Sequence, residues 1–281
     1  MDVQRVADSA EFVVRTGGLL LQDEPRNNLI LGLLGVLREQ PRVYPEFSLW
    51  LVEDLGEIVG AALRTPPHGL VLGPTSRTAA AALVESIEDD LPGAVGVLPE
   101  IDLFASAWSV RFDVATDVRF EQGIYALERL LEPRGVPGAP RQATEADLEL
   151  LRLWLLDFSR EALHEDEPDE GRIERTVRQR LEHNESSFLI WEDGEPVSVA
   201  GSGGNTPTGS RIGPVYTPPE RRGRGYGSAV TAAITRARLE SGRRFCFLYT
   251  DLANPTSNKI YVDLGYERIG ESREYVFEQR L

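Results

Sequence analysis

Cysteine and long apolar runs are scarce in this chain of 281 residues, and each shortage excludes a class of protein. Cys246 has no partner for a disulfide and lies inside an apolar run, which favours a buried structural thiol. The three histidines and this cysteine show no zinc-ligand spacing, so we expect no metal. The apolar run Leu29–Leu37 is far shorter than the roughly twenty residues that span a bilayer.

Acidic residues outnumber basic ones by 45 to 30, giving a formal net charge of -15 and a pI near 4.8. That balance argues against nucleic acid as a partner, because phosphate backbones attract basic surfaces. The N-terminus has no basic segment followed by an apolar one, so we expect a cytoplasmic protein without a signal peptide or membrane attachment. Leu29–Leu37 favours a core helix over a dimer contact, which leaves a monomer or a homodimer open.

Proline and glycine interrupt the chain most strongly between Pro133 and Pro140. Such density disfavours both helices and paired strands. The chain length also favours about two domains. We therefore expect a domain over residues 1–133, a linker over 134–141 and a second domain over 142–281.

The second half shows an ordered series of helix and strand signals. Thr144 is a helix N-cap followed by acidic residues, and Asp193-Gly194 is typical of a hairpin turn. The expected order is two helices, antiparallel strands, and then strand, loop, helix and strand. The ranges are a helix after Thr144 reaching Phe158, a helix over 169–182, strands over 187–191, 196–201 and 211–217, a helix over 228–240 and a strand over 245–250.

The first half repeats part of this order. The segment Ser48–Gly60 parallels Phe188–Val197, and Val71–Pro74 corresponds to Arg211–Pro214. Beyond that point the copies differ, because Thr75-Ser76-Arg77 passes straight into an alanine-rich helix. We interpret residues 1–133 as a degenerate copy of the second half. Chance similarity of two ordinary hairpins is the alternative.

The second half has a glycine-rich loop where the first half has none. Its residues are Arg222, Gly223, Arg224, Gly225, Tyr226, Gly227 and Ser228. Glycine reaches positive φ without a steric clash, so consecutive N–H groups can converge on an anion at the start of the next helix. No Lys-Ser or Lys-Thr follows, as a P-loop requires, and Ser228 stands where a dinucleotide loop has its third glycine.

Two motifs together are similar to those of the GCN5-related N-acetyltransferase (GNAT) family. Arg222, Gly225 and Gly227 fit its acetyl-CoA loop. Its second signature is matched by Asn254, Ser257, Ile260, Tyr261, Gly265 and Tyr266. Asp263 departs from the Lys or Arg that relatives often carry. The same segment has the signals of a helix. Asn254 suits its N-cap, Pro255 its first position and Gly265 the residue that ends it.

The resemblance implies an α+β fold of two tandem GNAT-like domains, each with a mostly antiparallel sheet flanked by helices. It implies acetyl-CoA as co-substrate and an amine, more often a small molecule than a protein, as acceptor. Contacts with CoA would come from Val215, Tyr216 and Thr217, from the loop Arg222–Ser228, and from Asn254, Ser257 and Asn258. A solvated surface charge is the plainer interpretation of each arginine.

The same resemblance makes Tyr261 the general acid that protonates the departing thiolate. No general base stands out. Glu220, Asp251, Glu165 and Asp166 are candidates, and water could serve instead. The acidic segment 164–170 suggests a cationic acceptor, although a hydrated acidic loop explains it equally well. The rival function is a noncatalytic module that binds acyl-CoA and regulates a partner.

Overall fold

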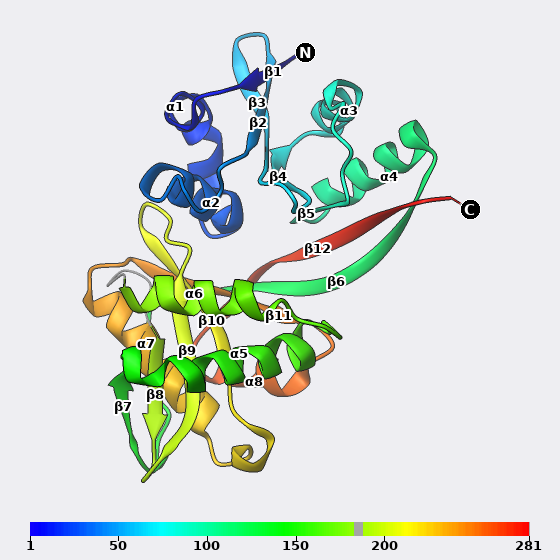
Figure 1. Ribbon diagram of the computed structural model, residues 1–281. Coiled ribbons are helices and arrows are strands. Elements are labelled where there is room, and N and C mark those ends of the chain that lie inside the picture. Colours follow the sequence, from blue (N-terminus) through cyan, green and yellow to red (C-terminus); the bar gives the residue numbers. More distant parts are fainter. Residues whose placement is uncertain (183–187, 281) are drawn as a thin grey trace. The chain divides into compact units, whose positions relative to one another are not determined.

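The computed structural model describes residues 1–182 and 188–280 (Figure 1). Residue 187, expected to begin a strand, lies outside them. The chain divides into two compact units. The N-terminal unit comprises Met1–Ile124, Gly204–Pro207 and Ile269–Leu281, and the C-terminal unit comprises Tyr125–Gly203 and Thr208–Arg268.

The N-terminal unit is a mostly antiparallel sheet covered by helices. Its strands follow the order β1, β2, β3, β4, β5, β12, in which only the β4 and β5 pair is parallel. The elements are β1 (Asp2–Val6), α1 (Ser9–Leu20), η1 (Leu21–Asp23), α2 (Asn28–Glu39), β2 (Ser48–Asp54), β3 (Glu57–Arg64), β4 (Leu70–Thr75), α3 (Arg77–Ser86), β5 (Gly93–Val97), α4 (Glu100–Phe112), β6 (Val114–Leu127) and β12 (Glu267–Gln279).

Both faces of this sheet are buried. Leu49 and Leu51 of β2 pack into a core with α1 and α2, whereas Trp50 and Val52 pack into another with α3 and α4. Alternate residues of a strand point to opposite faces, so a strand covered on both sides is apolar throughout. Figure 1 shows α1 and α2 on one side of these strands and α3 and α4 on the other.

The apolar run Leu29–Leu37 is a core helix. It forms most of α2, and its buried side chains are those of Ile30, Leu31, Leu34 and Leu37. They belong to the core that α2 shares with α1 and the strands. The prediction of a core helix is therefore confirmed. Within residues 1–182 and 188–280, no helix has both the length and the apolar character needed to cross a bilayer.

The C-terminal unit repeats this plan. Its strand order is β11, β10, β9, β8, β7, and only the β10 and β11 pair is parallel. The elements are β7 (Ala139–Gln142), η2 (Glu145–Asp147), α5 (Leu148–Ala162), α6 (Glu170–Glu182), β8 (Phe188–Glu192), β9 (Pro196–Gly203), β10 (Gly209–Tyr216), η3 (Pro219–Arg221), α7 (Tyr226–Glu240), β11 (Phe245–Asp251) and α8 (Pro255–Asp263).

Helices again cover the sheet in pairs. Side chains of α5 and α6, among them Leu151 and Val177, form one core with Phe188 and Ile190. The helices α7 and α8 contribute to a second core, which contains Val230 and also buries Cys246. The chain is thus a tandem of two similar α/β layouts, as the internal repeat predicted.

The strand β7 overlaps the segment 134–141 that was predicted as a linker. It pairs antiparallel with β8 along Ala139–Gln142, so the expectation that proline prevents pairing here is wrong. Pro140 is tolerated because β7 has a neighbour on one side only, and an edge strand can lack one N–H donor.

An ion-pair network fixes β7 to the start of α5. Both Nη atoms of Arg141 donate to the carboxylate of Asp147 at 2.7 Å, and its Nε donates to Glu192 at 2.7 Å. Asp147 also accepts from the backbone N–H of Thr144 at 2.8 Å, completing a capping box. The Arg141 hydrogen bonds lower the pKa of Asp147 despite its burial.

We expect Asp147→Asn to destabilise the C-terminal unit by about 2 kcal/mol at pH 7, because it leaves a half-buried guanidinium with only one carboxylate partner. A carboxyl whose folded pKa is depressed stabilises the fold above its unfolded pKa, near 4, and this stability disappears as pH falls through the folded pKa. Urea unfolding from pH 7 downward should therefore show the difference from wild type shrinking as pH falls below about 4. The control is Glu149→Gln at the exposed start of α5, which should change stability little. A gap that stays constant with pH would contradict this account.

Candidate functional site

The strands β10 and β11 pair at one end and then separate. Their parallel register ends at Arg211, and the pairing of β10 with β9 shifts across Gly213 and Pro214. Gly213 has φ +145, and Pro214 has no N–H to donate to a neighbour. Val215 stays paired with β9. Among the described residues, β10 therefore has no strand partner beyond Arg211 on the edge away from β9.

The helix α7 begins next to this strand end with an uncapped N-terminus. Its N-cap is Gly225, at φ +83, and no described side chain caps it. The first backbone hydrogen bond of the helix runs from Ala229 N to Gly225 O at 3.0 Å. The N–H groups of Tyr226, Gly227 and Ser228 precede it and have no partner within the helix. Together with the helix dipole they form a site for an anion.

The corresponding helix of the N-terminal unit, α3, has a capped N-terminus. There α3 has Ser76 as its N-cap, and the Ser76 hydroxyl accepts from Ala79 N at 3.1 Å. The serine cap satisfies one of the N–H groups that an anion would otherwise bind. The two units therefore differ at the helix start, as the missing glycine loop predicted.

Gly227 shows that the two predicted motifs lie together. A Cβ at this glycine would be 3.4 Å from Thr217 Oγ1 and 3.9 Å from Ile260 Cδ1. The first atom belongs to the end of β10 and the second to α8. The structure thus brings the glycine loop, the strand end and the second motif to one place, although they are up to 43 residues apart in sequence.

The loop arginines differ in their partners. Arg222 donates from Nε to the carbonyl of Thr217 at 2.8 Å and from Nη2 to Glu161 at 2.5 Å. Arg221 pairs with Glu195. Arg224 is exposed. The Arg222 side chain is therefore held against the end of β10.

Tyr226 turns its ring away from solvent. The side chain is buried, and its hydroxyl donates to Asp193 at the β8–β9 turn at 2.5 Å. This hydrogen bond to a carboxylate raises the pKa of Tyr226. Only its backbone N–H belongs to the open helix start. Gly223, at φ +75, supplies the other left-handed residue of the loop.

The asparagines of the second motif hold the start of α8. Asn254 is the N-cap, and its side chain accepts from Ser257 N at 3.1 Å. Asn258 donates from Nδ2 to the carbonyls of Asp251 and Leu252 at 3.2 and 3.3 Å. Its Oδ1 is buried and accepts no hydrogen bond among the described residues. That oxygen is an unmet acceptor at the end of β11.

Tyr261 is buried in the core that α7 and α8 share. Its ring meets Tyr266 edge-on at 6.1 Å between centroids. Burial raises the pKa of Tyr261 to about 12. The hydroxyl of the neighbouring Tyr266 shares a hydrogen bond with the hydroxyl of Thr235, with 2.7 Å between the two oxygens. Tyr261 has no such hydrogen bond within the part of the chain described, so its proton is available to a ligand.

Sequence reasoning missed Glu161, which ends the last turn of α5. Its carboxylate accepts from Tyr216 Oη at 2.9 Å and from Arg222 at 2.5 Å. Burial, followed by the bond to Glu161, raises the pKa of Tyr216. No local signal marks Glu161, because its partners lie 55 and 61 residues away.

Two of the acidic candidates considered from the sequence, Asp251 and Glu165, make local contacts. Asp251 accepts from Ala253 N at 2.8 Å in a local turn, and Glu165 pairs with Arg172 at 3.2 Å. Among the described residues, no group of three His, Cys, Asp or Glu side chains could hold a metal.

Comparison with known proteins agrees with this geometry. Residues 148–266, which contain both motifs, match the family described as Acetyltransferase (GNAT) family. Those residues form a GNAT domain. No curated protein is significantly similar to the chain.

Solved structures resemble the chain over its whole length. A Drosophila protein aligns with a TM-score of 0.71 at 13% identity, covering 99% of both chains. A tandem GNAT protein from the clavulanic acid biosynthesis pathway aligns with a TM-score of 0.60 at 14% identity, covering 100% of this chain and 99% of that one. An acetyltransferase from the GNAT family from Colwellia psychrerythraea aligns with a TM-score of 0.59 at 12% identity, covering 99% of this chain and 100% of that one. These likenesses show that the tandem fold extends beyond the GNAT domain.

Proposed function

We propose that the GNAT domain transfers an acetyl group from acetyl-CoA to a primary amine, with Tyr261 as the general acid. The observation that carries the proposal is the uncapped start of α7 beside the free edge of β10. A pyrophosphate needs convergent N–H donors, and an extended pantetheine arm needs an unpaired strand edge. Both occur here within van der Waals reach of one another, as the surroundings of Gly227 demonstrate.

In this proposal the backbone supplies most of the binding. Val215 and Thr217 pair with the pantetheine arm, and Tyr216 between them turns its side chain into the core under α5. The N–H groups of Arg222–Ser228 hold the pyrophosphate. Asn254, Ser257 and Asn258 fix the start of α8 beside the ligand.

The reaction requires a neutral amine and a proton for the leaving thiolate. The amine nitrogen forms a bond to the acetyl carbon as the carbon–sulfur bond breaks. The nitrogen then loses a proton to a base or to water, and sulfur gains one. Acetyl-CoA supplies the activated acyl group, and the protein's part is to orient it and to move these protons.

Tyr261 can deliver the proton because sulfur beside it would be equally desolvated. In water, a phenol near pKa 10 is a weaker acid than a thiol near 8.5, so transfer to the thiolate is uphill by about 2 kcal/mol. In the shared core, burial raises the pKa of both kinds of group, Cys246 and Tyr261 each to about 12. Desolvation of the leaving thiolate therefore works against this unfavourable difference.

The acceptor site has a less acidic character than the sequence suggested. Glu170 pairs with Arg152 at 2.9 Å and Glu165 with Arg172, so part of the charge of the acidic segment is matched. The remaining acidic residues of segment 164–170 still favour a cationic acceptor. Polyamines and aminoglycosides are therefore the first primary amines to be assayed.

Release of free CoA thiol tests the function. The chain's own cysteine is fully buried, so a thiol reagent reports CoA alone. We expect amine-dependent thiol release with at least one of a panel of polyamines, aminoglycosides and neutral primary amines. Calorimetric binding of acetyl-CoA should accompany it.

Two outcomes would contradict the proposal in different ways. Tight acetyl-CoA binding without thiol release across the whole panel would favour a noncatalytic acyl-CoA module. Preference for a neutral or anionic acceptor would leave the activity standing but exclude a cationic substrate.

A further inference from the structure

The glycine loop Arg222–Ser228 has a backbone with much freedom to lose. It follows η3 and leads into α7, and Gly223 and Gly225 both lie at positive φ, +75 and +83. Glycine reaches these angles without a clash, but it also loses the most conformational entropy when a loop is ordered. The N–H groups at the start of α7 converge on an anion only while the loop keeps one conformation. Contacts from outside the loop therefore decide how well the anion site is formed.

The first end of the loop is held by Glu161 of α5. Arg222 donates from Nη2 to the Glu161 carboxylate at 2.5 Å and from Nε to the carbonyl of Thr217 at 2.8 Å. Glu161 also accepts from the hydroxyl of the buried Tyr216 at 2.9 Å. The Arg222 guanidinium lies 5.7 Å from the centre of the Tyr216 ring. The helix α5 and the strand β10 thus together fix the side chain at which the loop begins.

The other end of the loop is held by Asp193. Tyr226 begins α7, its side chain is buried, and its hydroxyl donates to Asp193 Oδ2 at 2.5 Å. Asp193 lies in the β8–β9 turn, which a backbone hydrogen bond from Asp193 N to Glu195 O closes at 3.0 Å. Each end of the loop therefore contacts a carboxylate on a different element, 61 residues away for Arg222 and 33 for Tyr226.

The charge of these carboxylates opposes the ligand. Glu161 and Asp193 add negative charge beside a site for an anion, and like charges repel at a protein surface even where salt screens them. If the two residues acted through charge alone, their removal would strengthen acetyl-CoA binding. If they act by ordering the loop, their removal would weaken it. The two effects have opposite signs, so one binding measurement distinguishes them.

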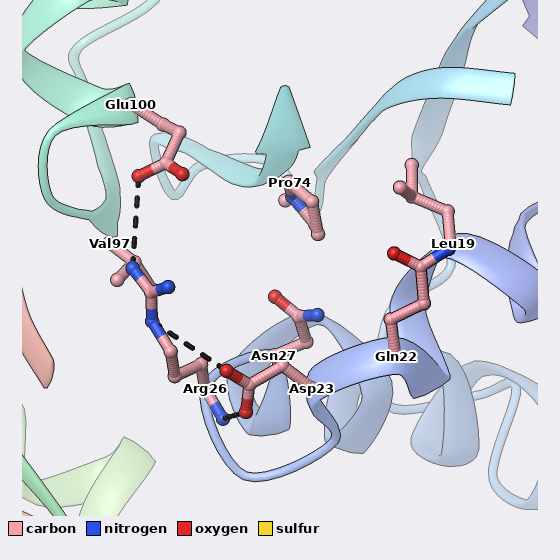
Figure 2. Close-up of a pocket in the computed structure, with 9 residues that line it drawn as sticks. Leu19, Gln22, Asp23, Arg26, Asn27, Pro74, Val97 and Glu100 are labelled. Atoms are coloured by element: carbon pink, nitrogen blue, oxygen red, sulfur yellow. Dashed lines mark hydrogen bonds and ion pairs between the residues drawn. The ribbon is translucent and has the colours of Figure 1, made fainter. Parts of the chain in front are cut away.

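The N-terminal unit has carboxylates at the corresponding separation of strands, but no glycine loop. There β4 and β5 cease to pair beside a cavity of about 100 Å³, lined in part by Asp23, Arg26 and Glu100 (Figure 2). Figure 2 shows both carboxylates approaching the Arg26 side chain, at 4.0 and 3.9 Å, and the next helix is capped by Ser76. The shorter contacts to both ends of a loop therefore occur in the unit that carries the loop.

We propose that Glu161 and Asp193 are positioning residues of the CoA site, which hold the pyrophosphate loop in its binding conformation through Arg222 and Tyr226. Neither carboxylate contacts the ligand. The inference rests on the proposed function, because it requires that the loop bind acetyl-CoA. An ion pair as exposed as Glu161–Arg222 adds little to global stability, so its effect is expected in affinity.

Calorimetric titration of the full chain with acetyl-CoA tests this role. Glu161→Ala and Asp193→Ala should each raise the Kd by about fivefold or more, although each removes a charge that repels the ligand. Glu195→Ala is the matched control, since Glu195 lies in the same turn as Asp193 but pairs with Arg221, which precedes the loop. It should leave the Kd unchanged or slightly lower. A misfolded fraction reduces the number of sites per chain and not the Kd, so it cannot mimic the expected loss.

The hydrogen bond between Asp193 and Tyr226 allows a double-mutant cycle. Tyr226→Phe removes this bond from the other side without changing any charge, and should raise the Kd by a similar factor. The double variant with Asp193→Ala should lose little more than either single variant, because both remove one interaction. Asp193→Asn keeps an acceptor for the Tyr226 hydroxyl and should bind more tightly than Asp193→Ala.

The outcomes separate this inference from the proposed function. A wild-type chain that does not bind acetyl-CoA would overturn both. A wild-type chain that binds, with a Kd for Glu161→Ala or Asp193→Ala at or below the wild-type value, would overturn the role of that residue alone. An equal loss of affinity in Glu195→Ala, or additive losses in the double variant of Tyr226 and Asp193, would also contradict positioning.

Discussion

Replacing Gly225 with valine should reduce acetyl-CoA affinity at least about 100-fold and abolish turnover. The residue has φ +83, which costs a β-branched side chain roughly 1 to 2 kcal/mol or more. A Cβ there would also lie 2.9 Å from Val136 Cγ2, so the loop or the segment that carries Val136 must shift. Movement misaligns the N–H groups of Tyr226 to Ser228, on which pyrophosphate binding depends. Calorimetric titration with acetyl-CoA measures the loss.

Gly242 supplies the matched control. It follows α7 with φ +93, and a Cβ at this position meets no atom within 4 Å. Gly242→Val thus imposes similar backbone strain at the opposite end of the same helix. We expect it to lower the unfolding temperature while acetyl-CoA affinity stays close to wild type. Equal losses of affinity in both variants would mean that general destabilisation, and not the geometry of the helix start, explains the effect.

Tyr261→Phe should lower kcat by about 100-fold to 10,000-fold with little change in the KM for acetyl-CoA. The substitution removes one hydroxyl and keeps the ring that packs against Tyr266. If Tyr261 acts only by packing, turnover should stay nearly unchanged. Steady-state assays of thiol release, with acetyl-CoA varied at saturating amine, separate the two parameters.

The control for Tyr261 is its neighbour. Tyr266 is also fully buried, but its hydroxyl bonds to Thr235. Tyr266→Phe should therefore cost stability and leave kcat close to wild type. A loss of kcat as large as that of Tyr261→Phe would show that any buried hydroxyl in this core matters, which contradicts a specific acid role.

Local signals in the sequence predicted the helix boundaries of the second motif well. Asn254 caps α8 and Pro255 begins it, and Gly265 follows it at φ +96, each as its residue type favours. The glycine loop likewise predicted an open start for α7. The absence of that loop in the first half agreed with the Ser76 cap of α3. Such features depend on a few adjacent residues, so the sequence alone specifies them.

Features that join distant residues could not be predicted in this way. Glu161 meets Arg222 across 61 residues, and Val136 lies against Gly225 from a segment expected to be an unpaired linker. The strand β7 forms in that same segment because an edge position tolerates Pro140. The cavity of the N-terminal unit also depends on tertiary packing. No spacing in the sequence brings η1, β5 and α4 together.

The number of CoA molecules bound per chain tests the central claim most directly. The GNAT domain has an open helix start at Gly225, whereas Ser76 closes its counterpart in the N-terminal unit. Isothermal titration of the wild-type chain with acetyl-CoA should give one site per chain, which Gly225→Val removes. Two sites per chain, or one site that persists in Gly225→Val, would contradict the account.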